Sequence, residues 1–108
     1  MQLQHGDVLL QGIKGLPKGV AQAQRREGRL VVAEGEVTGH HHAITDNGAT
    51  IWMLRKDGVE QMYLEVTEEQ VTITHEEHKP IEIPKGVYHI GIVKEYDYLR
   101  EMERRVID

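Results

Sequence analysis

The sequence predicts one mainly antiparallel β domain, a small barrel or sandwich, with a short C-terminal helix. Short runs rich in Val, Ile and Leu recur along the chain, and turn signals that contain Gly, Pro or Asn separate them. The chain also has no Phe and one Trp in 108 residues, so aliphatic side chains must build the core, which suits strands. This length is typical of one domain rather than two.

The apolar runs define the strands in order along the chain. The candidate strands span residues 7–11, 20–25, 29–34, 41–46, 50–55, 59–66, 70–75, 80–83 and 87–94. Two hairpin turns are predicted at Asn47-Gly48 and Asp57-Gly58, because both dipeptides tolerate the positive φ of a type I′ turn. The β domain is therefore expected to span residues 1–94.

Residues 95–108 have helical rather than strand spacing. Leu99, Met102 and Val106 fall on one stripe, and Asp97 can cap the first turn. We expect this helix to pack on the β domain or on a neighbouring subunit. A homo-oligomer is expected, since so small a sheet leaves strand edges that need cover.

Composition excludes several classes of site and partner. Without cysteine the chain has neither disulfides nor thiolate metal ligands. The N-terminal "MQLQHGDVLL" resembles no signal peptide, and no apolar run is long enough to span a membrane, so a cytoplasmic protein is expected. The net charge of −5 argues against nucleic-acid binding, although residues 14–26 carry local basic charge.

The histidines are the residues most suggestive of function, and there are seven of them. In "GHHHAI" strand alternation would place His40 and His42 on one face, with His41 pointing away. Two imidazoles held in this way can chelate one divalent ion. The competing interpretation is that they are exposed polar residues at a strand end.

A second group lies in "THEEHKPIEIPKGVYHI". His75 and His78 would point to opposite sides of a regular strand, but a turn or bulge at Glu76 and Glu77 would bring them together. His89 is expected to be either a ligand in the barrel interior or a core histidine. His5 is expected to be an ordinary surface residue.

Two stretches resemble the motifs of cupins. The first is His40-His41-His42 followed by Asp46, and the second is "PKGVYH", which runs from Pro84 to His89. The resemblance covers roughly residues 35–93 and implies a small barrel with a metal held by His40, His42, an acidic residue at Asp46, and His89. The chain departs from the cupin pattern in that Asp replaces the usual Glu, and in the residues Gly35, Gly48, His78 and Val93.

A second resemblance extends through nearly the whole chain. The strings "HGDVLL", "GEVTGHHH", "EEHKPIEIPKGVY" and "KEYDY" are similar to those of small bacterial and phage proteins to which no activity is attached. The histidines that recur in that pattern correspond to His40, His42 and His78. This resemblance places His78 ahead of His89 as a ligand.

These observations predict one divalent ion, Zn, Fe or Ni, bound by His40, His42, His78 and His89, with His75 and Asp46 ranked behind them. If the ion is catalytic, Glu76 or Glu77 would act as general base towards a small-molecule substrate. The sequence identifies no reaction.

Two other functions remain open. One is a non-catalytic assembly or adaptor protein of phage or mobile-element type, with its histidines at a subunit contact. The other is a metal-independent hydrolase or RNase in which His40, His42 or His78 acts as acid and base, assisted by Tyr88 or a lysine.

Overall fold

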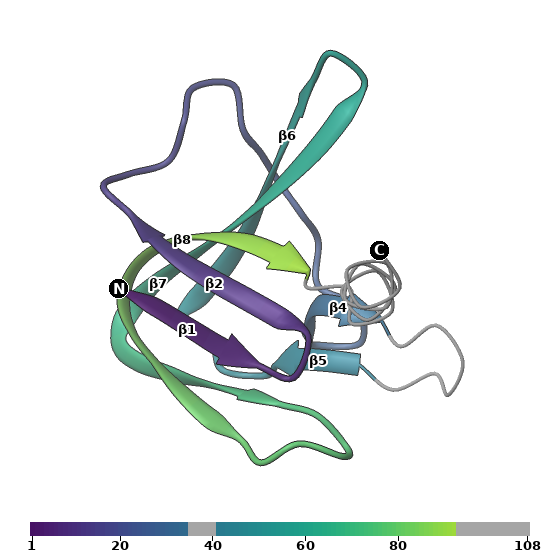
Figure 1. The fold of residues 1–108 in the computed structure, drawn as a ribbon, viewed down its shortest axis with the longest axis vertical. Coiled ribbons are helices and arrows are strands. Elements are labelled where there is room, and N and C mark those ends of the chain that lie inside the picture. The colour runs from purple at the N-terminus through teal and green to yellow at the C-terminus, as the bar shows by residue number, and fades with distance from the viewer. Residues whose placement is uncertain (35–40, 93–108) are drawn as a thin grey trace, which may run out of the picture.

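The computed structural model describes residues 1–34 and 41–92, which form one antiparallel sheet (Figure 1). Its strands are β1 (Gln2–His5), β2 (Val8–Ile13), β3 (Ala21–Gln22), β4 (Leu30–Glu34), β5 (His41–Ile44), β6 (Ala49–Lys56), β7 (Val59–Thr74) and β8 (Ile81–Ile92). β7 and β8 pair as a long central hairpin. β2 and β1 extend the sheet beyond β8, and β5 and β4 extend it beyond β7.

An irregularity in β7 allows this strand to change partners along its length. The register of β7 against β8 shifts between Val66 and Gln70. Before the shift β7 pairs with β6, and after it β7 pairs with β5. The backbone amides of Thr67 and Glu68 instead donate to the carbonyl oxygen of Gly48, at 2.8 and 3.4 Å. Because a bulge bends its strand, β5 and β6 occupy different parts of a folded sheet.

The folded sheet encloses an aliphatic core, as the absence of Phe predicts. Side chains from β2, β5, β6, β7 and β8 meet there, and the largest fully buried ones are Leu10, Ile44, Ile51, Leu64, Ile73 and Ile83. Burial of a Leu or Ile side chain contributes roughly 1.5–3 kcal/mol, so these residues dominate the stability of the fold. The core fixes the positions from which the connecting loops start.

The predicted antiparallel β class is confirmed, but the closed barrel is wrong. Among the described strands the sheet ends at β1 on one side and at β4 on the other, and no pairing joins these two edges. The ranges 59–66 and 70–75 are one strand, β7, and 80–83 and 87–94 correspond to one strand, β8. The turn signals Pro84 and Gly86 lie opposite the shift in β7, where they accompany a bend instead of ending the strand.

One of the two predicted hairpins is confirmed. Asp57 and Gly58 have φ of 53° and 75° and connect the paired residues Lys56 and Val59, as a type I′ turn requires. The hairpin at Asn47-Gly48 is wrong, because β5 and β6 do not pair with each other. The residues between them cross from one part of the sheet to the other.

The predicted C-terminal helix and the stripe of Leu99, Met102 and Val106 fall on residues that lie outside the described ranges. Within those ranges, the chain has no helix that is long and apolar enough to cross a membrane.

Candidate metal centre

The N-terminal hairpin forms one wall of the site. This hairpin was not predicted from the sequence. β1 pairs with β2 from Gln2 to His5, with Gly6 and Asp7 as a two-residue turn. Gly6 has φ of +58°, which matches the Gly-first composition of a type II′ turn. The dipeptide Gly-Asp was therefore a signal that could have found β1. The prediction that His5 is a surface residue is wrong, because its exposed fraction is 2%.

β5 supplies the second wall. His42 is paired with Ala33 of β4, and only 3% of its surface is exposed. Strand alternation points the side chain of His41 away from that of His42. His41 is half-buried, and its backbone amide donates to Glu76 Oε2 at 3.2 Å. His40 lies outside the described residues.

The connection between β7 and β8 supplies the third wall. His75 and His78 lie in this connection, and their ring centroids are 4.7 Å apart, which is the arrangement that a turn at Glu76 and Glu77 predicts. The backbone amide of Glu77 donates to His75 Nδ1 at 3.0 Å. His75 is half-buried and His78 is exposed, whereas His42 is buried.

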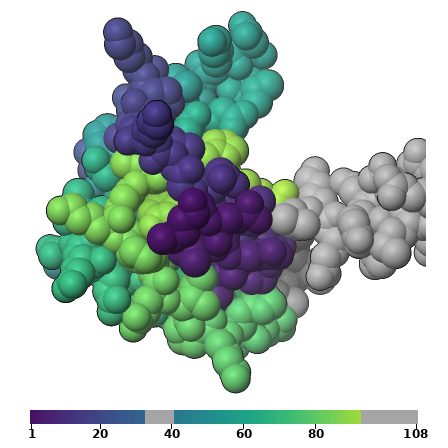
Figure 2. Space-filling model, turned by 60° about the vertical axis from the view of Figure 1, so that its left-hand side comes forward, coloured from purple at the N-terminus to yellow at the C-terminus, as the bar shows by residue number. Residues whose placement is uncertain are grey.

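These three walls bring histidines from distant parts of the sequence together. The ring of His42 lies 4.3 Å from that of His75 and 5.8 Å from that of His78. One ligand nitrogen from each of the three lies within 4.8 Å of the other two. Figure 2 shows the N-terminal segment, in purple, packed against the green β7–β8 region.

Close contacts at both ring nitrogens hold His42 in place. His42 Nδ1 lies 3.0 Å from His5 Nδ1, and His42 Nε2 lies 2.9 Å from Asp7 Oδ1. On the far side, His5 Nε2 donates to the carbonyl oxygen of Lys79 at 2.8 Å. The N-terminal hairpin and the β7–β8 connection are thereby joined through two imidazoles.

Gly6 leaves the space that this packing needs. A Cβ at this position would lie 2.6 Å from His78 Nε2 and 3.0 Å from His42 Cε1. Real Cβ atoms do not approach another atom to 2.6 Å, so the ring of His78 would have to move. Gly6 therefore serves the hairpin turn and the histidine group at once.

The site favours uncharged imidazoles on His42 and His5. Burial lowers the pKa of His42, with a smaller lowering from His75, while Asp7 partly opposes the shift. Burial also lowers the pKa of His5, against the hydrogen bond to Lys79, which raises it. A neutral imidazole retains the nitrogen lone pair that a metal ion needs.

Other predicted ligands lie apart from this group. His89 Nε2 is 2.6 Å from Gln61 Oε1, and its ring stands against Tyr63 at 5.4 Å. Strand alternation puts His89 on the opposite face of β8 from the buried Tyr88 and Ile90. Neither His89 nor Asp46 belongs to the group that the described residues bring within ligand distance.

The candidate acid–base residues also differ in their placement. Glu76 and Glu77 are exposed and lie between His75 and His78. Tyr88 is buried in the core, and its hydroxyl donates to the carbonyl oxygen of Pro84 at 2.7 Å. Of these three residues, only the two glutamates are beside the histidines.

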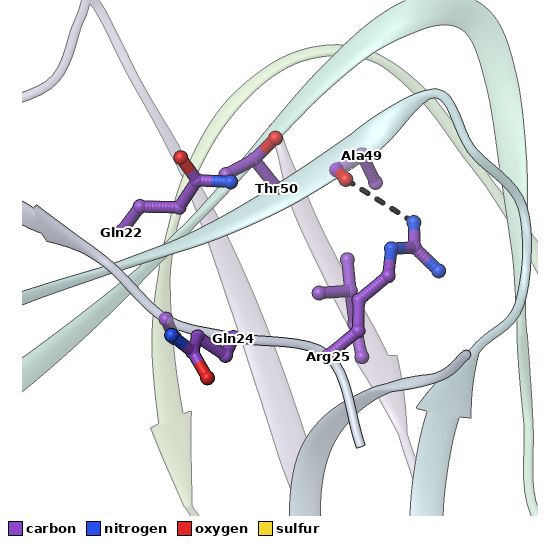
Figure 3. Close-up of a pocket in the computed structure, with 7 residues that line it drawn as sticks. Gln22, Gln24, Arg25, Ala49 and Thr50 are labelled. Atoms are coloured by element: carbon purple, nitrogen blue, oxygen red, sulfur yellow. Dashed lines mark hydrogen bonds between the residues drawn. The ribbon is translucent and has the colours of Figure 1, made fainter. Parts of the chain in front are cut away.

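A separate pocket of about 570 Å³ is lined by Gln22, Ala23, Gln24, Arg25, Leu30, Ala49 and Thr50 (Figure 3). None of its lining residues is a histidine. The Arg25 guanidinium donates to the carbonyl oxygens of Gly28 at 2.9 Å, of Thr45 and Ala49 at 3.4 Å each, and of Asp46. Arg25 thus fixes the residues that cross from β5 to β6. This arginine of the basic 14–26 segment therefore has a structural role.

Comparison with curated proteins gives no match, and neither does comparison with solved structures. One family model, described as "Domain of unknown function (DUF8820)", matches residues 4–92. The matched range runs from within β1 to the end of β8, and it includes all the histidines of the candidate centre. This chain therefore belongs to the DUF8820 family.

Proposed function

We propose that this protein binds one divalent metal ion through His42, His75 and His78. The observation that carries the proposal is the approach of three ligand nitrogens to within 4.8 Å of one another. Neighbouring nitrogens around a tetrahedral zinc lie about 3.3 Å apart, given metal–nitrogen bonds of about 2.0–2.1 Å. Small rotations of His75 and His78 towards the fixed ring of His42 would close this difference.

The three imidazole donors favour a divalent ion of intermediate softness. Three imidazoles without a thiolate suit Zn, Fe or Ni better than Mg or Ca, which prefer oxygen. The burial that lowers the pKa of His42 keeps this ligand in its metal-binding form at neutral pH. Zn²⁺ is the simplest probe, since it needs no control of redox state.

Zinc titration of the tag-free chain, first treated with a chelator, tests this proposal. We expect one Zn²⁺ per chain. His42→Ala, His75→Ala and His78→Ala should each weaken binding by more than about 100-fold, a larger loss than the 10–100-fold typical of a residue that only orients a ligand.

Two histidines serve as matched controls. His41→Ala alters the direct neighbour of His42, and His89→Ala removes an imidazole on another face of the sheet. Both variants should bind Zn²⁺ as the parent chain does. Absence of binding by the parent chain, or equal losses in all five variants, would contradict the proposal.

His40 is the one predicted ligand that requires a separate measurement. We propose from the sequence alone that it can add to the shell, because it stands two positions before His42, the spacing at which strand residues share a face. His40→Ala in the same titration decides the matter. A loss as large as that of His42→Ala would make His40 a ligand, whereas parent-like binding would remove it from the proposal.

A further inference from the structure

We propose that His5 is a fourth ligand of this centre and that His5 and His42 both bind the metal ion through Nδ1. The inference rests on the proposed function, because it assumes that His42, His75 and His78 hold a metal ion. It adds a ligand that no sequence motif indicates.

The hydrogen bonds of the two rings determine where their protons lie. His5 Nε2 faces the carbonyl oxygen of Lys79, and a carbonyl can only accept. His42 Nε2 faces Asp7 Oδ1, and an ionised carboxylate can only accept. Each neutral ring therefore carries its proton on Nε2. The lone pair of each ring lies on Nδ1.

The two Nδ1 atoms face each other at 3.0 Å. Two lone pairs at this distance repel each other unless a cation binds between or beside them. A metal ion beside the pair would do so, since two nitrogens bound to one ion at about 2.0–2.1 Å lie roughly 2.9–3.4 Å apart, from right-angled to tetrahedral geometry. The observed separation already falls in that range.

The outer partners are those that metal-bound histidines use. Such histidines donate their second ring N–H to a carboxylate or a backbone carbonyl, which fixes the tautomer and the direction of the ring. His42 has the carboxylate of Asp7 for this purpose, and His5 has the carbonyl of Lys79. Both rings are almost completely buried, so their directions are set before any ion binds.

The other two ligands lie near His5, although His5 is outside the group whose ligand nitrogens lie within 4.8 Å of one another. The ring of His5 lies 5.8 Å from that of His78 and 6.5 Å from that of His75. Lys79, whose carbonyl orients His5, directly follows His78 in the chain. Rotation of His75 and His78 towards the His5–His42 pair would complete a shell of four nitrogens. Four protein ligands are typical of a structural site, whereas a catalytic site keeps one position open.

Nuclear magnetic resonance of the histidine rings tests this inference on the full chain. Long-range ¹H–¹⁵N spectra are recorded before and after one equivalent of Zn²⁺. We expect Nδ1 of both His5 and His42 to shift from the unprotonated to the metal-bound position, while their Nε2 atoms stay protonated. The parent chain is used, so the result does not depend on a variant that fails to fold.

The outcomes separate the two proposals. If His42, His75 and His78 shift but His5 Nδ1 does not, the fourth ligand is refuted and the proposed function stands. If no ring responds to Zn²⁺, the proposed function itself fails. A His5 signal that responds to acid but not to Zn²⁺ would mean that only a proton is shared between the rings, which also refutes the inference.

Substitution provides a second test with a different readout. His5→Ala should weaken Zn²⁺ binding by more than about 100-fold, and added imidazole should restore it by filling the vacated position. Asp7→Ala, which removes an orienting partner, should cost about 10–100-fold, with no rescue by imidazole. If His5→Ala loses no more than Asp7→Ala and imidazole has no effect, His5 orients His42 and is not a ligand.

Discussion

His5 and His42 are 37 positions apart in the sequence, yet their Nδ1 atoms lie 3.0 Å apart in the structure. This contact connects the N-terminal hairpin to β5, and the bond from His5 to Lys79 connects both to the β7–β8 loop. The candidate centre is thus assembled from the N-terminal hairpin, β5 and the β7–β8 connection.

Gly6→Ala should weaken Zn²⁺ binding. The added Cβ would lie 2.6 Å from His78 Nε2 and 3.0 Å from His42 Cε1, so the ring of His78 must shift from its position. The left-handed φ of +58° adds about 1–2 kcal/mol of backbone strain. Zinc titration and thermal unfolding of the same sample measure the two effects separately.

Gly58→Ala is the control for that strain. Gly58 also occupies a two-residue hairpin turn with positive φ, and a Cβ there would meet nothing within 4 Å. This variant should lose about 1–2 kcal/mol of stability and bind Zn²⁺ normally. Equal zinc affinity in the two variants would show that Gly6 has no special part in the centre.

Zinc should break the hydrogen bond between the Glu77 amide and His75 Nδ1. A neutral His75 that accepts this bond carries its proton on Nε2. A metal ion at Nδ1 replaces the accepted bond, and a metal ion at Nε2 moves the proton to Nδ1, so either mode ends it. The Glu77 amide resonance should therefore shift on zinc addition. An unchanged amide would argue that His75 is not a ligand.

The stability of the metal-free chain should fall as the solution becomes acidic. Burial lowers the pKa of His42 and His5 below the unfolded value of about 6.5, so the unfolded chain binds more protons in this range. The contribution is present above about pH 6.5 and is lost as the pH falls towards the folded-state values. Urea unfolding at pH 7.5 and 5.5 in chelator measures this change. A free energy of unfolding that rises on acidification would contradict it.

Gly48→Ala should destabilise the fold through a clash and not through φ. Gly48 does not have a positive φ, but a Cβ on it would lie 1.9 Å from Glu68 Cγ and 2.5 Å from Glu68 Cβ. We expect a loss of about 1–3 kcal/mol, as for other overpacked sites. Glu68→Gly should reduce that loss in the double variant. The same loss in both backgrounds would rule out this clash.

Much of the fold is predictable from the sequence, because local signals determine it. The Asp57-Gly58 turn and the aliphatic runs of β2, β4, β6 and β7 follow from backbone preference and burial, which act over a few residues. The Asn47-Gly48 hairpin is wrong for a non-local reason, since the β7 irregularity and the Arg25 guanidinium hold that segment as a crossing. Neither contact is visible in a local pattern.

The candidate site is predictable only in part, for the same reason. His42 stands out by its alternation with His40, whereas His78 stands out only through the resemblance to small bacterial and phage proteins. The turn at Glu76 and Glu77 explains how His75 joins them. The contacts of His5 are not local, because its ring lies against His42 and its Nε2 donates to the carbonyl oxygen of Lys79, which is 74 positions away. The cupin-like motif predicts His89 as a metal ligand, but in β8 its ring lies against Gln61.

The most direct test of the central claim is the Zn²⁺ stoichiometry of the tag-free parent chain, measured by isothermal titration calorimetry after chelator treatment. Binding of one ion per chain, lost in His42→Ala and retained in His41→Ala, is the expected result. Absence of binding by the parent chain, or the same binding by His42→Ala and His41→Ala, would contradict a metal centre built on His42, His75 and His78.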